Sequence, residues 1–173
     1  AKKKILLAKN SISYETDPYK LFEWITDTKP KKIELKNLPY RYEMVAENVI
    51  NDSKSTNYHS LSYALKEAKN FFKGLNFVLI VCGDPKKENF RNISLHEPEE
   101  VFIFGVHSKD IDKCINHPKK TMMSSLSQTL ETIYKKRTTK NILFSPGYPS
   151  GKDFNNFKER GEHFNLLLKN YIS

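Results

Sequence analysis

Hydrophobic residues along this chain follow two spacings, which predict strands alternating with helices. Short, largely apolar runs stand at residues 77–81, 101–106 and 142–144. Runs of this kind are typical of strands that are buried on both faces of a parallel sheet. Between them, apolar residues recur at steps of three and four, which is the spacing of one face of a helix. Strands that alternate with helices imply a mostly parallel, right-handed α/β domain.

The remaining apolar positions predict the other elements of this domain. Residues 42–50 form the first strand region, and a long helix follows over residues 55–73, where Gly74 ends it as a C-cap. A short helix begins at Ser108. Two further helices are predicted from apolar stripes, the first at Met123, Leu126, Leu130 and Ile133 and the last at Phe154, Phe157, Phe164, Leu168 and Tyr171. The order of these elements predicts a Rossmann-like sheet flanked by helices, of the type that binds dinucleotides.

The N-terminal part of the chain shows no strand pattern of its own. Residues 5–8 indicate a helix fragment, and a second short helix begins at Asp17. We therefore expect residues 1–38 to form a short helical appendage, consisting of the tail of a preceding domain and a linker. Residues 39–173 are expected to form the α/β domain.

The charge of the chain favours an anionic partner. The sequence has 29 Lys and Arg residues against 20 Asp and Glu, a net charge of +9. Such an excess suits a nucleotide, a nucleic acid, an acidic surface or a polycarboxylate, although a composition rich in lysine would produce the same excess. Cys82 ends an apolar run, which favours a buried reduced thiol over a disulfide with Cys114. No apolar run reaches the length of a membrane span, so we expect a cytoplasmic protein without membrane contact.

Three polar loops follow predicted strands, at residues 51–57, 83–87 and 145–151. Because the carboxyl ends of parallel strands meet at one edge of a sheet, we expect these loops to converge there. The loops carry two cations, Lys54 and Lys86, and two hydroxyls, those of Thr56 and Ser150. The N–H groups near Gly151 add the N-terminus of the last helix. Such groups suit a small ligand that carries more than one carboxylate, or a phosphate. The alternative is that these are three solvated loops of a lysine-rich protein.

Several other kinds of chemistry are weakly supported by the sequence. The stretch from Gly147 to Asp153 resembles a phosphate-binding loop, but its glycines are four residues apart instead of five, and Asp153 replaces the hydroxyl that binds magnesium. The five histidines include no pair at i,i+4 spacing, and we predict no metal site. No arrangement of serine or cysteine with histidine indicates covalent catalysis, so we assign no catalytic residue. Any phosphate-binding loop for ATP is expected outside this chain.

Two motifs resemble those of the Mur ligases, the amide-forming enzymes of peptidoglycan synthesis. The first is Leu-Pro-Tyr-Arg-Tyr-Glu at residues 38–43, followed by Asn-Asp-Ser-Lys-Ser-Thr-Asn at residues 51–57. The second runs from Leu143 to Gly161 and ends in Glu-Arg-Gly. Within the family, the Asp-Ser-Lys-x-Thr-Asn form looks like that of the D-glutamate-adding branch. The resemblance implies that residues 39–173 are a C-terminal domain of this family, and that residues 1–38 are the end of its central ATPase domain and a linker.

The resemblance implies an ATP-dependent ligase that joins D-glutamate to UDP-N-acetylmuramoyl-L-alanine through an acyl phosphate, with magnesium held mainly by the central domain. It implies D-glutamate contacts from Lys54, Thr56, Lys86 (with Lys87 as the alternative), Ser150, the backbone of Gly151, and Phe157. It implies ATP contacts from Arg41 and Asp52. We expect a monomer that is inactive in isolation and binds no nucleic acid. The alternative that remains open is a basic, non-catalytic Rossmann-like module that binds a nucleotide or nucleic acid.

Overall fold

The computed structural model describes residues 17–29, 38–87, 92–136 and 139–172. The chain separates into two compact units, Ala1–Asn37 and Leu38–Ser173, and each is described by itself. The described part of the first unit contains helix α1 at Asp17–Thr26. This confirms the helix predicted to begin at Asp17, whereas the helix fragment predicted at residues 5–8 lies outside the described residues.

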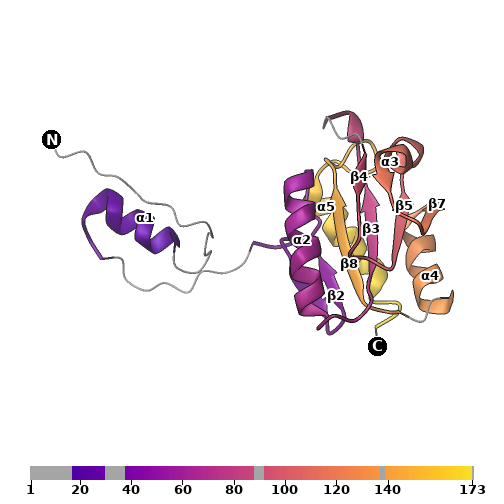
Figure 1. Ribbon diagram of the computed structural model, residues 1–173, viewed down its shortest axis with the longest axis horizontal. Helices are drawn as coiled ribbons and strands as arrows, with labels where there is room; N and C mark the ends of the chain where they lie inside the picture. The colour runs from indigo at the N-terminus through magenta and orange to yellow at the C-terminus, as the bar shows by residue number, and fades with distance from the viewer. Residues whose placement is uncertain (1–16, 30–37, 88–91, 137–138, 173) are drawn as a thin grey trace. The chain divides into compact units, whose positions relative to one another are not determined.

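The second unit is built around a six-stranded sheet (Figure 1). Its elements follow the chain in this order: β1 (Glu43–Ala46), β2 (Val49–Asn51), α2 (Tyr58–Phe71), β3 (Val78–Cys82), the 3₁₀ turn η1 (Pro85–Lys87), β4 (Ile93–Ser94), β5 (Glu100–Phe104), α3 (Ser108–Cys114), β6 (Ile115–Asn116), β7 (Lys120–Met123), α4 (Leu126–Lys136), β8 (Ile142–Gly147) and α5 (Phe157–Leu168). Across the sheet the strands stand in the order β1-β2-β8-β3-β5-β7, and neighbours are parallel except for β1 and β2. The predicted mostly parallel, Rossmann-like α/β fold is confirmed. In the part of the chain that the structure describes, no helix is long and apolar enough to cross a membrane.

Helices cover both faces of the sheet, which explains why its central strands are apolar throughout. In β3, Leu79 and Val81 belong to a buried cluster with residues of α2 and α3. Val78 and Ile80 belong to a second buried cluster, with residues of α4 and α5. In Figure 1, α2 lies in front of the sheet and α5 behind it. Successive residues of β3 therefore point to opposite faces that are both buried, so no polar residue alternates with them.

Some element boundaries differ from the predicted ones. Met123, predicted to lie in a helix stripe, is the last residue of β7, because this segment pairs with β5 and the helix begins only at Leu126. The first strand region is an antiparallel hairpin of β1 and β2 with an irregular register. The long helix begins at Tyr58, since Asn57 acts as its N-cap and accepts the Ser60 N–H.

The last helix is shorter than predicted. Phe154 and Tyr171 flank α5 instead of lying on it, yet both still pack against the buried cluster behind the sheet. Asn156 starts the helix by accepting N–H hydrogen bonds at its first turn. The small parallel pair of β4 and β6 was not predicted, because two residues per strand are too few to show a period.

Candidate functional site

The three strand-end loops meet at one edge of the sheet, as predicted. Because β8 lies between β2 and β3, the loop after β8 touches both of the others. Gly147 donates its N–H to Ser55 O at 3.0 Å, and Asp84 donates its N–H to Pro149 O at 2.8 Å. We call this edge the three-loop site, which consists of residues 51–57, 83–87 and 145–151.

Lys54 and Phe157, which are both predicted ligand contacts, lie against each other in the structure. The Lys54 ammonium lies 3.8 Å from the centre of the Phe157 ring, a cation–π contact. The backbone of Lys54 is also fixed, since its N–H donates to Tyr40 O at 2.8 Å. Lys54 is partly exposed, so a carboxylate from solvent can reach its ammonium and form a charge-assisted hydrogen bond.

Thr56, Ser150 and Gly151 lie in backbone segments that neighbouring elements hold. Thr56 stands directly before the N-cap residue of α2. Ser150 and Gly151 follow Pro149, whose carbonyl is bound by the loop after β3. All three are partly exposed. The fold therefore places these residues at the same edge as Lys54, and their contacts with a ligand stay predictions.

A fully buried arginine ties the loops together beneath this site. Arg160 donates from Nε to Ser53 Oγ at 3.1 Å and from one terminal nitrogen to Ser53 O at 2.8 Å. The other terminal nitrogen donates to Tyr148 O at 3.1 Å. Ser53 Oγ in turn donates to Phe157 O at 2.8 Å. Arg160 thus links the loops after β2 and β8 to the start of α5, directly beside Lys54.

Asp52 is buried, and its carboxylate is engaged within the fold. One oxygen accepts the Tyr42 N–H at 3.0 Å, and the other accepts the Ser145 hydroxyl at 2.9 Å. Burial raises the pKa of Asp52 to about 6, although these hydrogen bonds and the charges of Arg41 and Arg160 oppose the rise. The structure therefore gives Asp52 a role in holding the backbone, and its contact with ATP stays a prediction.

Asp52→Asn is expected to stabilise the protein at neutral pH and to change its stability little at about pH 4. The folded state binds the Asp52 proton more tightly than the unfolded state. Protonated Asp52 therefore stabilises the unmodified protein below about pH 4, and the unmodified protein loses this stabilisation as the pH rises from about 4 to about 6. The difference in pKa corresponds to about 3 kcal/mol above that range. Asparagine keeps an acceptor for Tyr42 and a donor for Ser145. Urea midpoints at about pH 4.5 and about pH 7.5 test this, and an equal pH dependence in both proteins would contradict it.

Arg41 is presented by a strained turn. Tyr40 and Tyr42, on either side of it, have positive φ angles of 61° and 48°. Such conformations cost free energy and persist where the surrounding structure fixes them. Asp52 holds the Tyr42 N–H, and the Tyr40 ring packs on Gly161, where an added Cβ would lie 2.4 Å from Tyr40 Cδ1. Arg41 itself is exposed, which suits a guanidinium that binds phosphate.

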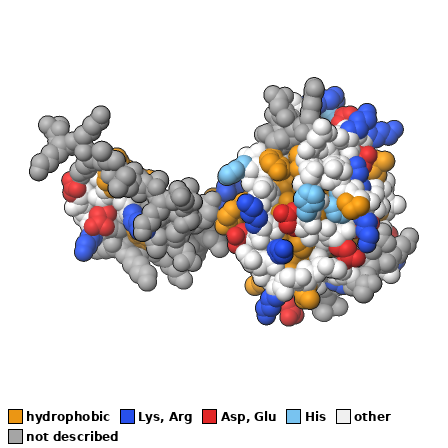
Figure 2. Space-filling model, in the orientation of Figure 1, with side chains coloured by type: hydrophobic (Ala, Val, Ile, Leu, Met, Phe, Trp, Pro, Cys, Tyr) orange, Lys and Arg blue, Asp and Glu red, His pale blue; other side chains and the backbone are white. Residues whose placement is uncertain are grey.

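Lysine side chains gather on the α3 side of the same edge. Lys86 in η1 and Lys109 and Lys113 in α3 are exposed, and Figure 2 shows Lys and Arg side chains at the upper end of the visible face. A hollow of about 410 Å³ lies here, lined by Pro85, Lys86, Asp110, Lys113 and Cys114. The predicted ligand contact Lys86 therefore lies near two other exposed lysines, with Asp110 in the same hollow.

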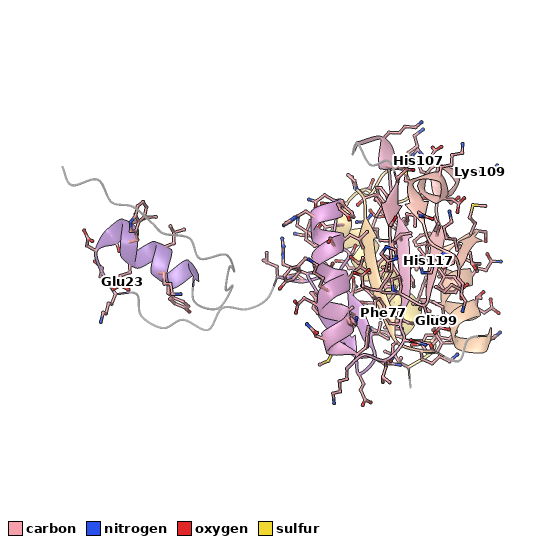
Figure 3. The ribbon with its side chains drawn as sticks, in the orientation of Figure 1. Glu23, Phe77, Glu99, His107, Lys109 and His117 are labelled. Carbon is pink, nitrogen blue, oxygen red and sulfur yellow. The ribbon has the colours of Figure 1, made fainter. Side chains whose placement is uncertain are left out.

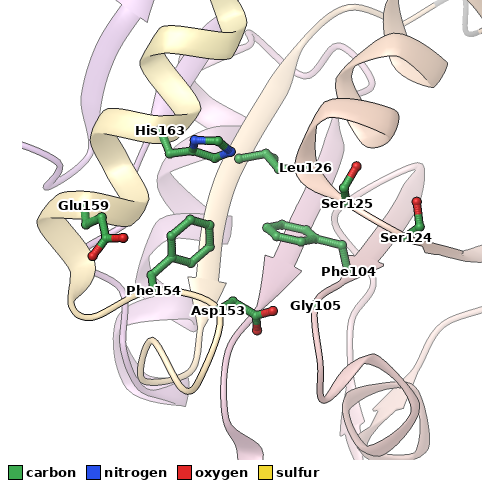
Figure 4. Close-up of a pocket in the computed structure, with 9 residues that line it drawn as sticks. All are labelled: Phe104, Gly105, Ser124, Ser125, Leu126, Asp153, Phe154, Glu159 and His163. Atoms are coloured by element: carbon green, nitrogen blue, oxygen red, sulfur yellow. The ribbon is translucent and has the colours of Figure 1, made fainter.

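Another hollow opens on the face of the sheet that α4 and α5 cover, between the end of β5, the N-terminus of α4 and helix α5 (Figure 4). It measures about 370 Å³ and is lined by Phe104, Gly105, Ser124, Ser125, Leu126, Asp153, Phe154, Glu159 and His163. Its two carboxylates already accept hydrogen bonds, Asp153 from the Val106 N–H and Glu159 from Asn155. These contacts brace the loop before α5. Of the described residues predicted to bind a ligand, none lines this hollow, so we do not place the site there.

The sequence patterns predicted no site role for Arg160, which entered only as part of the Glu-Arg-Gly motif, or for Asp84. Arg160 falls in the apolar stripe of the last helix, three residues after Phe157 and four before Phe164. A charged residue at that spacing signals a buried and hydrogen-bonded side chain, because the stripe faces the sheet. Asp84 gives no comparable signal, since an acid after a glycine is ordinary loop composition.

The fold is an α/β domain of Rossmann-like type, and the three-loop site is its candidate ligand-binding site. The chain is 32% identical over 145 residues to the UDP-N-acetylmuramoylalanine--D-glutamate ligase of Petrotoga mobilis, which covers 78% of this chain and 32% of that protein. It is 35% identical over 140 residues to the ligase of that name from Buchnera aphidicola subsp. Schizaphis graminum, with 76% and 31% covered. It is 30% identical over 146 residues to the one from Thermotoga maritima, with 80% and 33% covered.

The chain is homologous to the D-glutamate-adding members of the Mur ligase family. It spans about a third of the length of the curated relatives it matches. No family model matches the chain.

Proposed function

We propose that this chain forms the amino-acid-binding, C-terminal domain of an ATP-dependent ligase that adds D-glutamate to UDP-N-acetylmuramoyl-L-alanine in peptidoglycan synthesis. The observation that supports this most is the three-loop site, where Lys54, the Phe157 ring and the Ser150 loop are held together. The three-loop site is part of a chain whose relatives are named UDP-N-acetylmuramoylalanine--D-glutamate ligase. Residues 1–38 are proposed to be the end of the central domain and a linker.

The chemistry of D-glutamate suits such a site. The molecule carries two carboxylates, which call for cations or hydroxyl donors at two separate points. Lys54 and Thr56 would hold one carboxylate from the loop after β2. Lys86 and Ser150 would hold the other from the loops after β3 and β8, and the Phe157 ring would pack against the methylene groups between them.

In the proposed reaction, ATP phosphorylates the L-alanine carboxylate, the D-glutamate amine attacks the acyl phosphate, and phosphate leaves. This chain would contribute by orienting the amine, because a held nucleophile reacts as in an intramolecular reaction. Arg41 would bind a phosphate of ATP from its exposed position. Among the described residues, no cluster of three or more His, Cys, Asp or Glu side chains is placed to hold a metal ion. No step is therefore assigned here to the magnesium that accompanies ATP.

Lys54→Met is expected to weaken D-glutamate binding at least about tenfold while leaving the fold stable. Methionine keeps the length of the side chain and its contact with Phe157 but loses the charge, and a hydrogen bond to a charged group contributes about 1.5–3 kcal/mol. The measurement is an NMR titration of isotope-labelled protein with D-glutamate, followed at the amides of Thr56 and Ser150. Lys69→Met, at an exposed position of α2, is the matched control.

Parallel titrations define the class of ligand. Amide shifts at the three-loop site with D-glutamate, and smaller ones with L-glutamate and D-alanine, would support the proposal. Unchanged spectra with D-glutamate at tens of millimolar would contradict it. Binding of RNA or DNA that weakens steeply as the salt concentration rises would instead favour the basic, non-catalytic module.

A further inference from the structure

His107 lies between two carboxylates at the edge of the three-loop site. Its Nε2 is 3.9 Å from Asp84 Oδ1, and its Nδ1 is 3.7 Å from Asp110 Oδ2. The imidazole is only 11% exposed, and within the described part of the chain its Nε2 has no hydrogen-bond partner. Figure 3 shows His107 at the end of the sheet that carries Lys109, far from Phe77 at the other end.

Asp84 connects this histidine to the proposed D-glutamate contacts. Its Oδ1 accepts the Lys86 N–H at 3.0 Å, and its own N–H donates to Pro149 O. It also packs against Gly151, where an added Cβ would lie 3.1 Å from Asp84 Cβ. A carboxylate with no cationic partner at this position repels an anionic ligand that Lys86 would attract.

The protonation state of His107 decides how many hydrogen bonds its ring can donate to these two carboxylates. A neutral imidazole has a single N–H, whereas an imidazolium is a donor at both nitrogens. The present separations exceed ordinary hydrogen-bond lengths. The carboxylates that face the ring are those of Asp84, from the loop after β3, and Asp110, from α3. Asp153, from the loop before α5, accepts the N–H of the adjacent Val106, and Lys86 lines a hollow together with Asp110. An imidazolium would be attracted by both Asp84 and Asp110.

We propose that His107 positions Asp84: when the ring takes up a proton from solvent, it pairs with the Asp84 carboxylate and neutralises its charge, so that the three-loop site holds an amino acid with two carboxylates more tightly. The identity of that amino acid rests on the proposed function, whereas the pairing itself does not. The affinity of the site for its amino acid would then depend on the protonation of His107.

The pairing is tested on the ligand-free chain by NMR between about pH 5.5 and about pH 8. The Lys86 amide, which is bound to Asp84, is expected to shift with the same midpoint as the His107 ring. His107→Gln and Asp84→Asn should each abolish that shift, and His59→Gln, at an exposed position of α2, should preserve it. A Lys86 amide that does not titrate, or that titrates equally in His107→Gln, overturns the proposal.

The consequence for binding is tested with D-glutamate, whose carboxylates stay ionised across this pH range. The unmodified chain should bind it about fivefold more tightly at the lower pH. Asp52 also titrates near pH 6, so the comparison is made with His107→Gln, which keeps Asp52 and should lose most of the pH dependence. Equal pH dependence in the two proteins overturns the effect on binding. Absence of D-glutamate binding at every pH contradicts the proposed function, while the amide titration still decides the pairing.

Discussion

Replacing Arg160 with alanine is expected to lower the free energy of unfolding by about 3 kcal/mol and to abolish the proposed ligand binding at the three-loop site. The carbonyl oxygens of Ser53 and Tyr148 would stay buried without their donor, and each such group costs about 1–3 kcal/mol. Removing a buried charge offsets part of this, because burial lowers the pKa of the Arg160 guanidinium and disfavours its charged form. The unpaired carbonyls and the cavity left by a large, fully buried side chain outweigh that offset.

Urea titrations followed by circular dichroism give the size of the Arg160 effect. Lys158→Ala is the control on the same helix, and because Lys158 is exposed its substitution should change stability by less than about 0.5 kcal/mol. Arg160→Lys separates charge from geometry, since an ammonium cannot span both loops as a planar guanidinium does. If Arg160→Ala were as stable as Lys158→Ala, the linking role of Arg160 would be wrong.

Gly83→Ala is expected to be the most disruptive single methyl addition, with a loss of about 4 kcal/mol. The added Cβ would lie 2.2 Å from Pro149 O, a backbone atom of the neighbouring loop. The φ angle of Gly83 is +116°, a conformation that alanine adopts only with strain. The hydrogen bond from Asp84 to Pro149 would break as the loops separate. The proposed binding of D-glutamate should be lost with it, because Lys86 and Ser150 stand on either side of this contact.

Gly74→Ala is the matched control for this substitution. Gly74 also has a positive φ, +76°, but an added Cβ would meet nothing within 4 Å. Its cost should therefore be the backbone strain alone, about 1 kcal/mol. The difference between the two urea midpoints measures the steric part of the Gly83 effect. Two substitutions with equal effects would mean that the loops after β3 and β8 can separate freely.

The central strands were predictable because both faces of the sheet are covered. An unbroken apolar run such as residues 77–81 is typical of a strand buried on both faces. The edge strand β7 was not predictable, since it has a neighbour on one side only and mixed burial. Met123 fits a helical stripe as well as a strand, and only pairing with β5 decides between them. Local pattern therefore identifies buried elements better than peripheral ones.

The position of the three-loop site followed from the topology rule for parallel sheets, but its internal bonding did not. Asp52 and Lys54 are two residues apart in one polar loop, so composition treats them alike. In the structure Asp52 points inward to Ser145, and Lys54 reaches the Phe157 ring. Which way each side chain points depends on a turn fixed by Arg160 and β8, far away in the sequence. From the sequence alone, the residues of such a loop can be identified. Which of them stabilise the loop and which are available to a ligand cannot be told apart.

The insertion of β8 between β2 and β3 has a consequence for how the chain folds. Val49 pairs with Ile142, and so does Val78, so the centre of the sheet depends on contacts between residues distant in sequence. Such topologies fold slowly, because long loops must close before the contacts that stabilise them can form. On the ribosome, β2 could pair with β1 and β3 with β5, but each would keep one unpaired edge until β8 emerges. A nascent chain in that state should depend on chaperones to avoid aggregation.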